Sequence, residues 1–209
     1  MTRQHFSRRR ALNLANSDIV SSDTERLILV DAQDNIVGHL DKLSCHNGVG
    51  VLHRAFSLFI FNPRGELLMQ QRASNKRLWP LYWSNSCCSH PRERETMDVA
   101  VARRCAQELG FTTALTYMYK FEYSAQFDQQ GSERELCSVY VGQYDGEPSV
   151  NPTEIAAWRW IAPTKLDEEL ATSPANFTPW FKLEWQRLQS EFNIQNTSIL
   201  TLENQRPEL

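Results

Sequence analysis

The most informative stretch of the chain is TMDVAVARRCAQELG, residues 96–110. Apolar side chains recur in it every four residues, at Met97, Val101, Cys105 and Leu109. This spacing places them on one face of a helix, and Gly110 stands where a left-handed C-terminal cap belongs. The stretch therefore predicts a helix over residues 96–109 that packs one face against a core.

Extended segments lie on both sides of this helix. Apolar patterning predicts strands at 26–31, 52–61 and 66–72 before it, and at 115–128, 133–144 and 155–161 after it. A last helix is predicted to begin at Thr178-Pro179, a capping residue followed by proline at the first helical position. The order of elements predicts a mixed α+β domain without internal repeats.

The length and charge of the chain restrict its function. Its 209 residues suit one catalytic domain, expected at 25–192, with flexible tails at 1–24 and 193–209. Lys and Arg total 22 against 25 for Asp and Glu, so there is no excess of positive charge to hold a nucleic-acid backbone. No apolar run approaches the ~20 residues that a membrane helix needs. We therefore expect neither nucleic acid nor a membrane as a partner.

The cysteines and the N-terminal region indicate the compartment. Arg8-Arg9-Arg10 resembles part of a twin-arginine export signal, but no sustained apolar segment follows it. The chain has five cysteines, an odd number without the regular spacing of secreted disulfide proteins. We therefore expect reduced thiols in the cytoplasm. A monomer is expected because no long exposed apolar face is evident.

Three histidines, His46, His53 and His90, lie in or beside segments predicted to be ordered. Imidazole suits Zn, Mn, Fe or Ni, and hard divalent ions add carboxylates. Glu133 and Glu135 are the obvious partners, because an i, i+2 pair on a strand points to one face with Cα atoms ~7 Å apart. The alternative is a solvated hairpin edge with scattered surface histidines, and spacing alone does not exclude it.

The segment WSNSCCSHP, residues 83–91, is the most distinctive of the chain. A thiol two residues from a histidine suits acid–base chemistry when a neighbouring cation or metal shifts it toward thiolate. A buried, inert cysteine is the alternative, and periodicity does not choose between Cys87 and Cys88. A third possibility is a structural zinc site formed by Cys45, His46, Cys88 and His90.

The helical stretch also fits the spacing of the Nudix box, G-x5-E-x7-R-E-U-x-E-E-x-G-U with U aliphatic, aligned from Ser89 to Phe111. Nudix hydrolases use several carboxylates of this box to hold metals on a diphosphate and activate water. Two of them are replaced here by Arg104 and Gln107, and Glu108 remains, so hydrolysis is disfavoured. Glu108 can still hold one Mg²⁺ that bridges to a diphosphate, and Arg104 attracts phosphate oxygens.

Over residues 25–192 the chain resembles the type 1 isopentenyl-diphosphate Δ-isomerases, Nudix-fold enzymes that interconvert isopentenyl and dimethylallyl diphosphate. The resemblance is carried, in family order, by CH (45–46), LHRAF (52–56), RASNK (72–76), WP (79–80), WSNSCCSHP (83–91), RRCAQELG (103–110), FEY (121–123), ERE (133–135) and FTPW (177–180). It implies a Nudix-like fold with a mixed sheet flanked by helices, and an isomerase of isoprenoid biosynthesis.

The same resemblance implies roles for individual residues. One divalent metal, Mn²⁺, Zn²⁺ or Mg²⁺, would be held by His46, His53, His90, Glu133 and Glu135. Glu108 would bind Mg²⁺ together with the substrate diphosphate. The diphosphate itself would be held by Lys42, Arg72, Lys76, Ser89 and Arg104. Acid–base catalysis would fall to Cys88 on one side and Glu135 with Tyr123 on the other, with Trp180 as an aromatic wall.

Proton addition and removal at two carbons require an acid and a base on two faces of the allylic unit. Protonation of an alkene gives a tertiary carbocation that water would capture, so the pocket must be dry, and Trp180 would stabilise the cation through its ring. No flavin is required, and no flavin-binding signature is present. Two rival functions are a Nudix hydrolase, which would release phosphate, and an inactive Nudix-fold module that binds a prenyl or nucleotide diphosphate.

Overall fold

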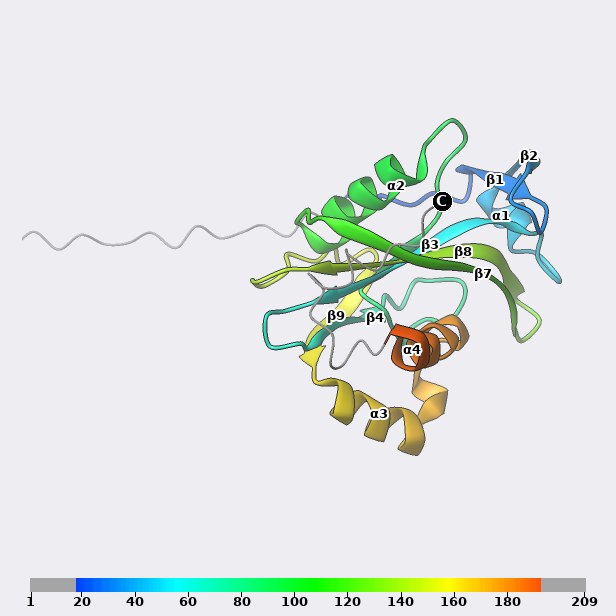
Figure 1. The fold of residues 1–209 in the computed structure, drawn as a ribbon. Helices are drawn as coiled ribbons and strands as arrows, with labels where there is room; N and C mark the ends of the chain where they lie inside the picture. Colours follow the sequence, from blue (N-terminus) through cyan, green and yellow to red (C-terminus); the bar gives the residue numbers. More distant parts are fainter. Residues whose placement is uncertain (1–17, 193–209) are drawn as a thin grey trace, which may run out of the picture.

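Figure 1 shows the computed structural model, which describes residues 18–192. Most of the two predicted tails, residues 1–17 and 193–209, lies outside the described residues. Within the described range, nine strands form one mixed sheet, and the α-helices lie on its two faces. In that range no helix combines the length and apolar character needed to cross a membrane.

Strand β3 (His53–Phe61) is the centre of the sheet. It pairs in parallel with β8 (Gly131–Gln143), from His53 opposite Glu135 to Phe61 opposite Gln143. Its antiparallel neighbours are β1 (Arg26–Val30), β4 (Leu67–Arg72) and β6 (Cys87–Ser89). Because both faces of β3 are covered, nearly all of its residues are buried, which explains its continuous apolar run.

The outer strands complete the sheet. The hairpin partner of β1 is β2 (Ile36–Asp41), and β7 (Leu115–Phe127) pairs antiparallel with β8. On the other side, β4 pairs with β9 (Ile155–Ile161) and with the short β5 (Trp83–Ser84). All six predicted strands match observed ones within two residues at each end, and the largest offset is that of 133–144, which begins two residues late against β8.

The predicted helix at 96–109 is present, but its last turn is wider than expected. Thr96 caps α2 (Met97–Arg104), and a π-helical segment follows at Cys105–Leu109. Gly110 ends it with φ 77°, which confirms the left-handed cap. There, a Cβ would lie 2.6 Å from the Ser149 carbonyl oxygen, so the cap also requires glycine for space.

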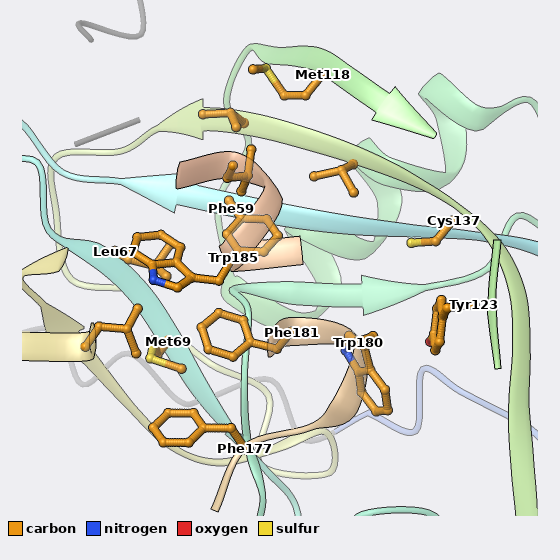
Figure 2. Packing of buried hydrophobic residues seen from close by; sticks show 14 of the residues in the cluster. Phe59, Leu67, Met69, Met118, Tyr123, Cys137, Phe177, Trp180, Phe181 and Trp185 are labelled. Carbon is orange, nitrogen blue, oxygen red and sulfur yellow. The ribbon is translucent and has the colours of Figure 1, made fainter. Parts of the chain in front are cut away.

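Two hydrophobic clusters hold the helices on the sheet. On one face, Ala100 and Val101 of α2 and Cys105 of the π-helical segment pack against Phe56 and Leu58 of β3. On the opposite face, α3 (Pro163–Thr172) and α4 (Pro179–Phe192) cover a larger cluster that includes Phe59, Phe181 and Trp185. Figure 2 shows Trp180, Phe181 and Trp185 of α4 packed in this second cluster, together with Tyr123. This face also carries the candidate site.

Candidate active site

Five predicted metal ligands converge beside β3 and β8. His46 follows the short helix α1 (Lys42–Cys45), His53 begins β3, and His90 follows β6. Glu133 and Glu135 point from one face of β8, as the i, i+2 spacing predicts. One potential ligand atom from each of the five residues lies within 4.8 Å of the others. Residues distant in the sequence therefore form one compact N₃O₂ donor set.

The local hydrogen bonds orient these donors toward a common point. Nδ1 of His46 lies 2.6 Å from the Lys42 carbonyl oxygen, and Nδ1 of His53 lies 2.7 Å from that of Val51. Since a carbonyl only accepts, each Nδ1 carries a proton, which leaves Nε2 as the metal-binding nitrogen of the neutral ring. His53 Nε2 and Glu133 Oε2 are buried without a hydrogen-bond partner among the described residues, and this Glu133 oxygen lies 2.7 Å from Nε2 of His46. Orphaned acceptors of this kind fit a divalent cation between them.

Burial and neighbouring charges separate the pKa values of the cluster. Burial lowers the pKa of His53 to about 4 and that of His90 well below its ordinary value. Burial opposes ionisation of Glu133, but the adjacent His46 outweighs it and lowers the pKa of this carboxyl. Burial and the Glu133 charge together raise the pKa of Glu135. Glu133 in turn raises the pKa of His46, so the neutral rings are those of His53 and His90. Neutral imidazoles beside an ionised carboxylate are the forms that metals bind.

The structure argues against two alternatives that the sequence left open, a solvated hairpin edge and a structural zinc site. Glu133 and Glu135 are buried, not on a solvated hairpin edge, because β8 lies between β3 and β7. Cys45 and Cys88 are not members of the donor cluster found among residues 18–192, which argues against a structural zinc site of two cysteines and two histidines. The Cys45 thiol faces the Leu40 carbonyl oxygen at 3.8 Å instead.

The proposed acid–base groups lie next to the metal ligands. The Tyr123 hydroxyl donates to Oε2 of Glu135 at 2.6 Å, while Oε1 of the same carboxyl lies 2.8 Å from Nε2 of His90. Burial raises the pKa of the Cys88 thiol to about 12, although Arg72 opposes this shift. This shift favours the neutral thiol over the thiolate at Cys88.

The adjacent cysteines occupy opposite faces of the sheet. Cys88 lines a cavity of about 390 Å³ together with His90, Tyr123, Glu135 and Trp180. Cys87 is fully buried on the other face, in the cluster under α2. The sequence could not distinguish these two residues by periodicity, whereas strand alternation in β6 separates them.

The cavity is also lined by the residues expected to hold a diphosphate, which are Lys42, Arg72, Lys76, Ser89 and Arg104. Burial and the charges of Lys76 and Arg104 lower the pKa of Lys42, which indicates concentrated positive charge that an anion would neutralise. Arg72 differs from the other cations because it lies beside the proposed catalytic groups. Its guanidinium is 5.3 Å from the Trp180 ring centre and 3.8 Å from the Cys88 sulfur.

Carboxylates hold the cations in place. Glu108 is not among the residues that line the cavity; its Oε1 accepts from Nε of Arg104 at 2.8 Å. Glu154, which the sequence did not single out, lines the cavity and pairs with both Lys76 and Arg104. No motif signalled Glu154, because its partners are remote in the chain. Arg104 therefore lies between two buried acids, where the Nudix box of a hydrolase has a carboxylate of its own.

A segment assigned to the N-terminal tail also reaches this cavity. The Val20 carbonyl oxygen accepts from Arg104 at 2.7 Å, and the Ser21 hydroxyl pairs with Lys42. Asn151 donates to the Asp18 carbonyl oxygen at 2.8 Å. Residues 18–21 thus contact two of the cations expected to bind the diphosphate.

Comparison with known proteins agrees with this geometry. Residues 51–181 match the NUDIX domain. A relative from Photorhabdus laumondii named isopentenyl-diphosphate Delta-isomerase 1 is 44% identical over 172 residues, covering 81% of this chain and 98% of its own. One from Burkholderia multivorans named isopentenyl-diphosphate Delta-isomerase is 45% identical over 157 residues, covering 75% and 89%.

Among solved structures, DR0079 from Deinococcus radiodurans matches with a TM-score of 0.65 at 24% identity, over 78% of this chain and 98% of that one, a likeness of fold. The predicted Nudix-like fold is therefore confirmed. The chain belongs to the Nudix-domain family and, within it, to the isopentenyl-diphosphate Δ-isomerases.

Proposed function

We propose that the protein interconverts isopentenyl diphosphate and dimethylallyl diphosphate in isoprenoid biosynthesis. The observation that carries this proposal is the composition of a single cavity. Its cations Lys42, Lys76 and Arg104 suit a diphosphate, and its thiol and carboxyl at Cys88 and Glu135 suit proton transfer to and from carbon. The names of the relatives support the same activity.

In this proposal Cys88 and Glu135 act on two faces of the allylic unit. Glu135, with the Tyr123 hydroxyl on its Oε2, is one acid–base partner, and the Cys88 thiol is the other. Trp180 is 2% exposed and meets Trp79 in a T-shaped contact with ring centres 5.2 Å apart, so its ring is shielded from water. A dry aromatic face stabilises a tertiary carbocation by about 2 kcal/mol and offers no nucleophile to capture it.

The three histidines and two glutamates would hold one divalent metal, which makes groups in its coordination sphere more acidic. Imidazole and carboxylate donors of this kind suit Mn²⁺, Zn²⁺ or Mg²⁺. Glu108 would hold Mg²⁺ that arrives with the diphosphate; its pairing with Arg104 keeps the carboxylate beside the cationic side of the cavity. Lys42, Lys76, Ser89 and Arg104 bind and orient the diphosphate, with Arg72 as a further ligand.

We also place the protein in the cytoplasm, as a monomer without nucleic acid or membrane partners. The five cysteines support a reducing compartment, because all of them are unpaired and four are buried. Light scattering of the purified protein measures the oligomeric state.

The test is incubation of the purified protein with isopentenyl diphosphate, Mg²⁺ and Mn²⁺ in D₂O, followed by NMR. We expect dimethylallyl diphosphate that carries deuterium, without release of phosphate. Phosphate release would establish a hydrolase instead. Binding without chemistry, in the presence of Mg²⁺, Mn²⁺ and Zn²⁺ in turn, would favour a binding module.

A further inference from the structure

Glu184 is a buried carboxyl that the proposed reaction does not use. It lies in α4, one helical turn after Trp180, on the side that faces the sheet. Its exposed fraction is 0%, and its Oε2 has no hydrogen-bond partner among the described residues. Burial raises its pKa to about 8, although Ser57 and Cys137 oppose the shift by hydrogen bonds. This shift favours the uncharged acid at neutral pH.

The contacts of Glu184 lead to two strands that carry proposed catalytic groups. Its Oε1 lies 3.5 Å from the Cys137 sulfur, which lies 3.6 Å from the Ser57 hydroxyl. Ser57 of β3 is the direct cross-strand partner of Cys88 in β6. Cys137 follows Glu135 by two residues on β8 and so points to the same face.

Its surroundings make this polar contact unusual. Two neighbouring buried side chains of α4, Phe181 and Trp185, belong to the hydrophobic cluster on this face of the sheet. Figure 2 shows Trp180, Tyr123 and Cys137 in one part of that cluster. A leucine would fill this position without the cost of burying a polar group. A polar contact inside an apolar interface fixes one arrangement of the helix on the sheet, whereas apolar contacts alone tolerate small shifts.

We propose that Glu184 is a positioning residue for the isomerisation: its carboxyl ties α4, which carries Trp180, to the strands that carry Cys88 and Glu135. This inference rests on the proposed function. The tie acts through Ser57 on β3 and through Cys137 on β8. It holds the aromatic face of Trp180 at a fixed place relative to the two proton-transfer groups, and small misplacements of such groups are costly in rate.

The test compares Glu184→Leu with Glu184→Gln by steady-state kinetics on isopentenyl diphosphate. We expect Glu184→Leu to lower kcat about tenfold while KM changes by less than about twofold, because the diphosphate ligands lie on other elements. Glu184→Gln keeps an acceptor and a donor for Ser57 and Cys137, so it retains most of kcat. Ser57→Ala lowers kcat too, and its effect is not additive with Glu184→Leu.

Leu188→Ala is the matched control. Leu188 is a fully buried residue of the same helix, one turn farther from Trp180, and its truncation lowers stability through a cavity. We expect its kcat to stay near the wild-type value. Equal kcat in wild type and Glu184→Leu, or equal losses in Glu184→Leu and Leu188→Ala, would overturn the positioning role. A wild-type protein without isomerase activity would overturn the proposed function, and this inference with it.

Discussion

At the scale of single residues, β6 assigns different environments to two adjacent thiols. Cys88 lines the cavity, and Cys87 is buried beneath α2 on the other face of the sheet. We expect Cys88→Ala to abolish isomerisation and to leave diphosphate binding largely intact, because in the proposed mechanism the thiol transfers a proton whereas the cations bind the diphosphate. Deuterium-exchange NMR measures the reaction, and calorimetric titration with inorganic pyrophosphate measures binding.

Cys87→Ala is the natural control for that experiment. Removing the buried sulfur of Cys87 costs roughly 1 kcal/mol of stability, comparable to one buried methylene. The cavity that Cys88 lines is unchanged, because Cys87 is not part of its lining. Its kcat should therefore stay close to that of the wild type. Equal losses of activity in both variants would show that the pair matters through packing, and that the catalytic assignment of Cys88 is wrong.

Trp180 combines two roles that substitution can separate. Its Nε1 donates to the Ser84 hydroxyl at 3.1 Å, and its ring borders the cavity. Trp180→Phe keeps an aromatic face but loses that hydrogen bond, so we expect a stability loss of about 1 kcal/mol and a partly retained rate. Trp180→Leu removes the aromatic face, and a loss of about 2 kcal/mol corresponds to roughly thirtyfold in kcat. Equal kcat in the two variants, with both folded by circular dichroism, would contradict cation stabilisation.

At the scale of elements, the tip of the β7–β8 hairpin contacts a residue of the proposed metal site. Gly131 has φ 150°, and a Cβ there would lie 2.2 Å from the His46 carbonyl oxygen. The next residue, Ser132, donates its amide to that same oxygen at 3.0 Å. We expect Gly131→Ala to displace His46 and to weaken Mn²⁺ or Zn²⁺ binding about tenfold, as loss of support for a ligand does. Metal titration of the dialysed protein measures this affinity.

Gly65→Ala is the control for Gly131→Ala, because it tests backbone strain without a steric clash of the added Cβ. Gly65 also has a positive φ, 76°, in the turn after β3, but a Cβ there meets nothing within 4 Å. We expect it to cost about 1–2 kcal/mol of stability without a change in metal affinity. If Gly131→Ala binds metal as tightly as Gly65→Ala does, the hairpin tip does not support the site.

The elements also show what the sequence could predict. The periodic helix and the longer strands were predictable because each repeats its pattern over several residues, as in α2 and β3. The strand β2 and the helices α1 and α3 were not predicted. The side chains of β2 are half-buried or exposed along its whole length, and α1 is a single turn, so neither has a period to detect. In α3 only Leu166 is buried.

The candidate site was predictable only in part for a related reason. Family motifs place the histidines, Glu133 and Glu135 together, and the structure brings them within reach of one ion. Glu154 and Glu184 have no motif, and their importance comes from partners that lie far away in the chain, Arg104 and Ser57. Such contacts depend on tertiary packing, which local patterns do not encode.

At the scale of the whole molecule, one face of the sheet serves both as core and as site. The larger hydrophobic cluster includes Tyr123, Cys137 and Trp180, which adjoin the metal ligands, and it continues to Trp185 and Leu188. Burial on this scale allows the site to exclude water, but it also places ionisable groups where charging them is costly. The pH dependence of stability should therefore report on this face.

Glu184 makes that dependence measurable. Its folded pKa of about 8 exceeds the unfolded value of 4.5, so the folded protein binds more protons between these values. The contribution of Glu184 to stability is therefore fully present below about pH 4.5 and is lost as pH rises toward 8, by on the order of 4 kcal/mol. Groups that face it are Tyr119 on β7, Cys137 and Glu135 on β8, and Cys88 on β6. The Glu184→Gln variant retains all four of these groups.

We expect urea unfolding at a series of pH values to separate the two proteins. At pH 5 the free energies of unfolding of wild type and Glu184→Gln should be similar, because a protonated carboxyl and an amide make comparable contacts. At pH 8 the variant should be the more stable, since it has no charge to bury. The other titrating groups shift both curves alike, so the difference isolates Glu184. Parallel curves from pH 5 to pH 8 would show that the carboxyl is ionised or solvated in the folded protein.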